Sequence, residues 1–361
     1  MGNERAYWLA FHLVYGISLR WIERLRTHFG ALATAWEADQ AQLQQLGLRD
    51  SILERFRTLR QRLDPHQYLA TVEAQGIRVL CYPDEAYPPR LREIPSPPLA
   101  LFMRGELTPA DDRAVAIVGT RQATSYGQLV TQQLASELCQ HGITIVSGLA
   151  YGIDRVAHEA ALDAGGRSIA VFGTGVDVVY PRAHQRLAER LIKQGAILSE
   201  FPPGTRPIAE NFPIRNRIIS GLSLGVIVVE APMRSGALIT ARFAAEQGRS
   251  VYAVPGPITS PVSQGTLALL KDGATPIGSA RDILDDLQLE VRQLALPTPP
   301  APSPASPHEA QILALLAHGP YHIDDLAAEL GLGISQMNVL LLEMQLRGQV
   351  RHLGSQLYAR V

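Results

Sequence analysis

Six short apolar segments follow one another between residues 113 and 256: AVAIVGT, ITIVSG, RSIAVFGTG, AILSE, GVIVVEA and SVYAVPG. Amphipathic helical patterns such as YGQLVTQQLASELCQHG and SGALITARFAAEQG lie between them. Continuous apolar strands that alternate with helices are typical of a parallel sheet covered on both faces. The sequence therefore predicts an α/β domain over residues 111–290, with a Rossmann-like, doubly wound and mostly parallel sheet.

Different patterns flank this domain. Residues 1–65 contain short helical patterns around turn glycines, which predicts a small helical module. Residues 66–110 contain two short strands between proline-rich turns and are expected to pack on the sheet as an extension. Proline and alanine dominate residues 291–307, which predicts a stiff, extended linker. Three helical patterns and a short hairpin around Gly354 predict a winged helix over residues 308–361.

Charge and cysteine content exclude several classes of protein. The 361 residues carry a formal net charge of -1, so a nucleic-acid site has to be a local patch and not a uniformly basic coat. The two cysteines, Cys81 and Cys139, have no metal or CxxC spacing, which fits a reducing cytosol. Because no run of about 18 apolar residues occurs, we expect a cytoplasmic protein without a membrane span.

Glycine-bearing turns follow the first three strands of the domain. GTRQATSYG begins at Gly119, SGLAYGID at Ser147 and GTGVDVVYP at Gly173. Glycine lets an anion approach the backbone N–H groups at the start of a helix. A tight turn without a ligand would explain one of these segments, but three at one edge of a sheet favour a phosphate-binding edge.

Familiar nucleotide and metal motifs are absent from the sequence. The third glycine of the dinucleotide fingerprint would fall at Val178, and no Gly-Lys pair exists for a P-loop. HExxH, GxSxG and paired metal-ligand spacings are also missing. We therefore expect no catalytic residue, no metal and no cofactor.

An arginine-rich stretch from Thr205 to Arg249 carries six arginines against three glutamates, a net charge of +3. Within it, FPIRNRIISGLS reads as the start of a helix, and we expect Arg215 and Arg217, on either side of Asn216, to lie in its first turn. The positive end of the helix macrodipole lies there, so two guanidinium groups oppose the local field unless an anion is bound. We interpret both arginines as phosphate ligands.

Six ordered blocks of the sequence carry a family resemblance. They are VAIVGTRQATSYG, VSGLAYGIDRVAHEAAL, AVFGTGVDVVYPRAH, LSEFPPGTRPIAENFPIRNRIISGLS, VVEAPMRSGALITARFAAEQGRSVYAVPG and GTLALLKDGA. Together they resemble the DNA-processing protein A family, also called DprA or Smf, from about Gly76 to Asp286. The N-terminal helices are similar to the sterile-alpha-motif-like (SAM-like) module of that family, and the C-terminal segment is similar to its winged helix.

This resemblance implies a cytoplasmic protein of bacterial natural transformation. Such a protein binds incoming single-stranded DNA, protects it from nucleases and loads the recombinase RecA onto it. Members of the family are homodimers that associate through the Rossmann-like domain, and RecA docks on the same domain. They bind DNA without a metal or a nucleotide cofactor.

The resemblance also assigns DNA-binding residues. The Gly-Ser/Thr-Arg turn of the family falls on Gly119, Thr120 and Arg121, and its Phe-Pro-x-Arg-Asn-Arg helix start falls on residues 212–217. The basic residue after its Tyr-Pro pair falls on Arg182. We expect a row of arginines to hold successive phosphates, with backbone N–H donors from the glycine-bearing turns and slight sequence preference. The full expected set is Gly119, Thr120, Arg121, Ser147, Gly148, Gly173, Tyr180, Arg182, Phe212, Arg215, Asn216, Arg217 and Lys271.

Two alternatives remain open. One is an enzyme similar to the nucleotide phosphoribohydrolases of the lysine-decarboxylase-like superfamily, which carry PGGxGTxxE where this sequence reads APMRSGALITARF, without the paired glycines or the glutamate. The other is a scaffold whose arginines serve only salt bridges. The winged helix raises a separate question, because residues 307–361 carry three arginines against five acidic residues. We expect this module to contact protein or to regulate, and not to bind duplex DNA.

Overall fold

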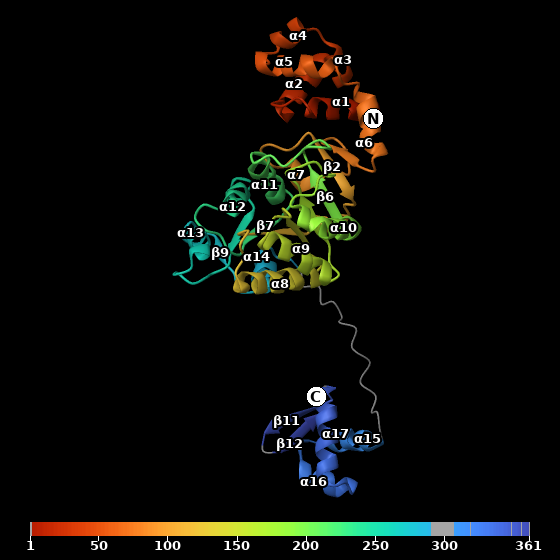
Figure 1. Cartoon of the computed structure of the whole chain (residues 1–361), viewed down its shortest axis with the longest axis vertical. Coiled ribbons are helices and arrows are strands. Elements are labelled where there is room, and N and C mark those ends of the chain that lie inside the picture. Colours follow the sequence, from red (N-terminus) through yellow and green to blue (C-terminus); the bar gives the residue numbers. More distant parts are fainter. Residues whose placement is uncertain (1, 290–306, 318, 348, 355, 361) are drawn as a thin grey trace. The chain divides into compact units, whose positions relative to one another are not determined.

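The computed structural model describes residues 2–289, 307–317, 319–347, 349–354 and 356–360 (Figure 1). The chain divides into two compact units, Met1–Arg292 and Gln293–Val361. Of the predicted linker over residues 291–307, all but the last residue lies outside the described residues.

The larger unit is built on a nine-stranded sheet with the order β1-β2-β6-β5-β4-β3-β7-β8-β9. The strands β6-β5-β4-β3-β7-β8-β9 all run parallel. In contrast, β2 pairs antiparallel with both β6 and β1. The predicted doubly wound, mostly parallel sheet is confirmed, and the six predicted strands are β3 to β8. The bounds are β1 Arg78–Cys81, β2 Ala100–Gly105, β3 Ala114–Val118, β4 Thr144–Ser147, β5 Ser168–Val171, β6 Gly195–Ser199, β7 Gly225–Val228, β8 Ser250–Ala253 and β9 Thr275–Pro276.

Helices cover both faces of this sheet because its strands are apolar on both sides. Ala116 and Val118 of β3 face α11 and α12, whereas Val115 and Ile117 face α8 and α9. The longest helix, α8, has 16 residues, and no helix of the described chain is long and apolar enough to cross a membrane. The bounds are α7 Pro89–Arg92, η1 Pro109–Asp112, α8 Ser125–Gln140, α9 Ile153–Asp163, η2 Arg182–His184, α10 Gln185–Gln194, α11 Asn211–Gly221, α12 Gly236–Glu246, η3 Pro261–Ser263, α13 Gln264–Lys271 and α14 Ala280–Asp286.

Six helices precede the sheet, and α1 and α6 of this group pack on its β1–β2 edge. Their aromatic core includes Phe11, which stacks on Phe56 with 5.6 Å between ring centroids, and Trp36, which meets both rings edge-on. The same apolar cluster continues through Trp8 to Phe102 of β2. The helices are α1 Gly2–His12, α2 Leu19–Phe29, α3 Leu32–Glu37, α4 Gln40–Gln45, α5 Asp50–Arg60 and α6 Pro65–Ala74.

The smaller unit has the predicted winged-helix architecture. Three helices bury Ile312, Leu326, Met337 and Leu341 in one core beside a three-stranded sheet of order β10-β12-β11. The elements are α15 Pro307–Leu316, β10 Tyr321–His322, α16 Ile323–Leu330, α17 Ile334–Leu346, β11 Val350–Gly354 and β12 Leu357–Arg360.

The strand order reverses once in the large sheet. From β3 the chain builds β4, β5 and β6 toward one edge, and α11 then carries it back to β7 on the other side of β3. The loops after β3 and β7 therefore diverge at the carboxyl end of the sheet. Ligands of doubly wound folds bind in the crevice at such a point.

Candidate nucleic-acid interface

A cleft lies at this switch point between β3 and β7. Its volume of about 690 Å³ is within the range of natural ligand sites. The turn after β3, the residues that lead into α11 and the turn after β7 form its walls. Among its lining residues are Gly119, Thr120, Arg121, Gln122, Asp154, Tyr180, Pro207, Ala209, Phe212, Arg215, Asn216, Arg234, Ser235 and Thr240.

Two exposed arginines stand on the walls of the cleft, Arg121 after β3 and Arg234 after β7. Neither makes a hydrogen bond or an ion pair with any residue that the structure describes. The turn that carries Arg121 is fixed to the segment after β7, because the backbone N–H of Thr120 donates to the carbonyl oxygen of Glu230 at 2.7 Å. The cleft therefore presents two cationic groups on anchored turns.

An aromatic pair lies at the mouth of the cleft. The rings of Tyr180 and Phe212 are 5.6 Å apart between centroids and tilted by 46°, and Tyr180 is 44% exposed. The Phe212 ring packs directly against Gly173, because a Cβ at position 173 would lie only 2.9 Å from Cδ1 of the ring. The structure thus places Gly173 beneath an aromatic ring and not in the lining of the cleft.

Arg215 lies at the floor of the cleft but is only 5% exposed. Its Nη1 donates to the carbonyl oxygen of Gly148 at 2.8 Å and also to that of Val171. Burial lowers the pKa of Arg215 to about 10, so the guanidinium stays charged at neutral pH. Asp154 lies nearby and accepts hydrogen bonds from the N–H groups of Gly148 and Ala150, while burial raises the pKa of its carboxyl group. Arg215 therefore supplies a buried charge beneath the cleft, in contrast to the expected open phosphate ligand.

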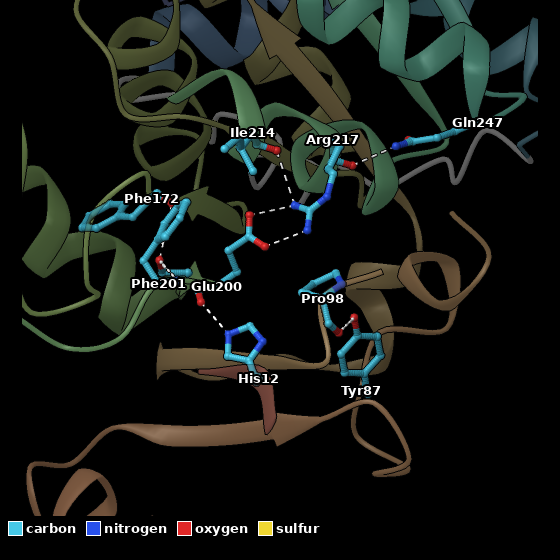
Figure 2. A network of polar contacts seen from close by, with 10 residues as sticks. His12, Tyr87, Pro98, Phe172, Glu200, Phe201, Ile214, Arg217 and Gln247 are labelled. Atoms are coloured by element: carbon cyan, nitrogen blue, oxygen red, sulfur yellow. Dashed lines mark hydrogen bonds and ion pairs between the residues drawn. The ribbon is translucent and has the colours of Figure 1, made fainter. Parts of the chain in front are cut away.

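Arg217 does not line the cleft. Its guanidinium binds both carboxylate oxygens of Glu200, with Nη1–Oε1 at 2.8 Å and Nη2–Oε2 at 2.6 Å, and the two side chains are 15% and 11% exposed (Figure 2). The expectation that Arg215 and Arg217 occupy the first helical turn is wrong, because α11 begins at Asn211 and places both in its second turn. Arg217 is thus paired within the protein.

Of two residues expected to offer backbone donors, Ser147 is buried in the sheet and Gly148 already donates its N–H within the protein. Ser147 is buried within β4, and its hydroxyl donates to the carbonyl oxygen of Ile117 at 2.7 Å. The N–H of Gly148 donates to Asp154. Asn216 does line the cleft, and its Nδ2 donates to the carbonyl oxygen of Gly236 at 3.2 Å, where α12 begins.

Two further expected cations lie outside the lining of the cleft. Arg182 is the first residue of η2, two positions after Tyr180, and Lys271 is the last residue of α13. Both side chains are exposed. The structure therefore brings together Gly119, Thr120, Arg121, Tyr180, Phe212, Arg215 and Asn216, and leaves Ser147, Gly148, Gly173, Arg182, Arg217 and Lys271 out of the lining.

Arg234 is a cleft residue that the expected set omitted. The sequence signal for it was its position between the end of β7 and Ser235, whose hydroxyl accepts a hydrogen bond from Ala237 at the start of α12. A residue at that point lies at the ligand-binding edge of a doubly wound sheet.

Acidic groups are sparse in the cleft. Asp154 is the one carboxylate among the lining residues, and Glu246 pairs instead with Arg242 at 2.8 Å toward the end of α12. Among the described residues, no three His, Cys, Asp or Glu side chains gather as a metal site requires. The chemistry that the lining offers is cation, amide and aromatic contact.

The sequence matches two family models. Residues 78–288 match the model of the DNA recombination-mediator protein A, and residues 296–356 match that of the DprA winged helix domain. Protein Smf of Synechocystis sp. is 36% identical, with 99% of both chains covered. Protein Smf of Escherichia coli is 41% identical over 86% of this chain and 85% of its own length.

Solved structures from two bacteria are among those similar to this chain. DNA processing protein A (DprA) from Streptococcus pneumoniae aligns with a TM-score of 0.68 and 35% identity, over 78% of this chain and 97% of its own. DNA processing protein A from Helicobacter pylori, described for its single-stranded DNA binding mode, aligns with a TM-score of 0.53 and 32% identity, over 59% of this chain and 95% of its own.

Proposed function

The chain belongs to the DNA recombination-mediator protein A family, and from that premise we propose that it binds single-stranded DNA in the cleft between β3 and β7. The observation that carries the proposal is one cleft lined by Arg121, Arg234, Tyr180 and Phe212. Arginine pairs with phosphate oxygens through its planar fork of donors, and aromatic rings stack on unpaired bases.

The aromatic pair supports a single strand over a duplex. Base faces are covered by their neighbours in a double helix, so Tyr180 and Phe212 gain a stacking partner only from a splayed or unpaired base. Stacking and phosphate contact carry little sequence information, and the binding we propose is accordingly almost independent of sequence.

The wider role we propose is that of a recombination mediator in natural transformation. In this role a homodimer, formed through the Rossmann-like domain, protects incoming DNA in the cytoplasm and loads RecA onto it. The family membership supports this role, and so does the description of the Helicobacter pylori relative as a binder of single-stranded DNA. We propose binding without turnover, because the sole carboxylate of the lining, Asp154, accepts two backbone hydrogen bonds.

Fluorescence anisotropy with a labelled oligothymidylate tests the binding proposal. The parent protein should bind the strand, and the double variant Arg121→Ala, Arg234→Ala should lose most of that affinity while it keeps its melting temperature. Equal affinity of the two proteins would place the strand elsewhere. Release of free base from nucleoside monophosphates would favour an enzyme, and a RecA-loading assay on DNA coated with single-strand-binding protein tests the mediator role.

A further inference from the structure

A loop forms one wall of the cleft, and an ion pair joins the start of this loop to the helix that follows it. Residues 200–210 connect β6 to α11, and Pro207 and Ala209 of this loop line the cleft. Glu200 lies directly after β6, and Arg217 lies in the second turn of α11. Their bidentate ion pair therefore joins the two ends of the segment that carries the loop and Phe212.

This ion pair is shielded from solvent. Removal of one partner of such a pair strongly destabilises the fold, because the other charge stays without compensation in a region of low dielectric constant. The carbonyl oxygen of Arg217 also accepts a hydrogen bond from Nε2 of Gln247 at 3.0 Å. Arg217 is thus held both through its side chain and through its backbone (Figure 2).

The N-terminal helices contact the same point. His12 ends α1, and its Nε2 lies 2.6 Å from the carbonyl oxygen of Glu200 (Figure 2). Because a carbonyl oxygen only accepts, Nε2 must carry the hydrogen. Burial lowers the pKa of His12, although the contact with Glu200 opposes this shift, so the neutral ring is favoured. A residue 188 positions away in sequence thereby fixes the backbone at the start of the loop.

We propose that His12, Glu200 and Arg217 are positioning residues for the strand-binding cleft, through which the N-terminal helices and bound single-stranded DNA stabilise each other. The proposal rests on the proposed function. In this arrangement Arg217 orders the loop and α11 but touches no phosphate. Coupling of this kind is reciprocal. DNA bound in the cleft must strengthen the contact of α1 with Glu200 by as much as that contact strengthens the binding of DNA.

The substitution Glu200→Gln separates this role from direct phosphate binding. A phosphate ligand at Arg217 would be released from its competing carboxylate, and affinity for the strand would rise. A positioning residue would lose its charged partner, the loop would loosen, and affinity would fall about tenfold, within the usual range for coupled sites. The log–log salt slope should stay that of the parent protein, because no phosphate contact is lost.

Asp111→Asn is the matched control. Asp111 forms a comparable bidentate pair with Arg167, with Nε–Oδ1 at 2.9 Å and Nη2–Oδ2 at 2.8 Å. Asp111 is the third residue of η1 and Arg167 directly precedes β5, so this pair lies at the amino ends of the strands, opposite the cleft. This variant should lose stability but bind oligothymidylate as tightly as the parent protein.

Oligothymidylate binding to the parent protein is measured first, by anisotropy across a salt series. Absence of binding would overturn the proposed function itself. If the parent binds, equal or higher affinity of Glu200→Gln overturns only the positioning role. Hydrogen exchange of the α1 amides in the parent chain provides a second test that needs no variant. Slower exchange in the presence of oligothymidylate supports the coupling, and unchanged exchange contradicts it even if Glu200→Gln fails to fold.

Discussion

Nη1 of Arg215 donates a hydrogen bond to the carbonyl oxygen of Gly148 at 2.8 Å and so ties α11 to the end of β4 beneath the cleft. The same atom reaches the carbonyl oxygen of Val171 at the end of β5. One buried guanidinium therefore joins the helix on one wall to two neighbouring strand ends. This contact fixes the position of α11 relative to the sheet edge and keeps a positive charge under the strand we propose to bind there.

Replacing Arg215 should reduce stability directly. Arg215→Met leaves the carbonyl oxygens of Gly148 and Val171 without their donor and leaves Asp154 without a nearby cation. We expect a loss of about 3 kcal/mol in the free energy of unfolding. Urea denaturation measures it, with the solvent-exposed substitution Arg242→Ala as the control. A loss equal to that of the control would contradict the role given to Arg215.

Arg121 should behave in the opposite way. It is exposed and without a partner among the described residues, so Arg121→Ala should leave the unfolding free energy unchanged. The affinity for oligothymidylate should fall, and the log–log salt slope should become shallower by about 0.7, the value for one phosphate contact on a single strand. Titrations at several salt concentrations decide this, and an unaltered slope would show that Arg121 holds no phosphate.

Tyr180 should contribute to affinity without contributing to the salt slope. Tyr180→Ala removes one ring of the aromatic pair, and we expect a loss of about 1–3 kcal/mol in binding free energy if a base stacks there. Tyr180→Phe keeps the ring and should bind as the parent protein does. The same anisotropy titration measures both variants, and equal binding by Tyr180→Ala would place the bases elsewhere.

His158 should make the α/β domain sensitive to acid. Its Nδ1 lies 2.7 Å from the hydroxyl of Ser168, which itself donates to the carbonyl oxygen of Ile145. Burial lowers the pKa of His158 to about 3, against about 6.5 for an unperturbed histidine. The unfolded chain therefore binds the proton first as the pH falls, and stability declines below pH 6.5, by about 2 kcal/mol at pH 5.

Urea denaturation at pH 7.5 and pH 5 measures this contribution. Other groups titrate in the same range, so the comparison is with His158→Asn, which keeps a donor near Ser168 but binds no proton. The parent protein should lose more stability than the variant between the two pH values. Equal losses would mean that His158 is not the group responsible.

The winged helix should not contribute to strand affinity. Arg347, which follows α17, is paired with both Glu309 and Glu343, while Val339 and Leu342 are exposed on that helix. A chain that ends at residue 292 should therefore bind oligothymidylate as tightly as the full chain. A marked loss of affinity would show that the module contacts DNA and would contradict the protein-contact role we expect for it.

The sequence predicts the sheet and the turns at its carboxyl edge well because both follow from local patterns. Apolar runs such as AVAIVGT mark buried strands, and the glycine-bearing turns mark their carboxyl ends. The apolar and glycine patterns do not indicate in which direction each arginine side chain of α11 points. Arg215 and Arg217 are two residues apart, so their side chains point roughly 200° apart around the helix axis. Helical periodicity alone therefore indicates that they face nearly opposite sides of α11.

Other features of the site depend on long-range contacts. Nothing near Arg217 in the sequence indicates that Glu200 pairs with it, or that His12 reaches the same point from the first helix. Burial of Ser147 and the engagement of the N–H of Gly148 likewise follow from the packing of β4 and from Asp154. Side-chain partners of this kind are set by the tertiary fold, which a pattern of residue types does not specify.

We propose that single-stranded DNA lies across the cleft between β3 and β7. Ultraviolet crosslinking of the full chain to oligothymidylate, followed by mass spectrometry of the joined peptides, tests it most directly. We predict crosslinks on peptides that contain Tyr180 or Phe212, and their loss when Arg121 and Arg234 are both replaced by alanine. Crosslinks confined to the N-terminal helices or to the winged helix would show that the strand does not lie in this cleft.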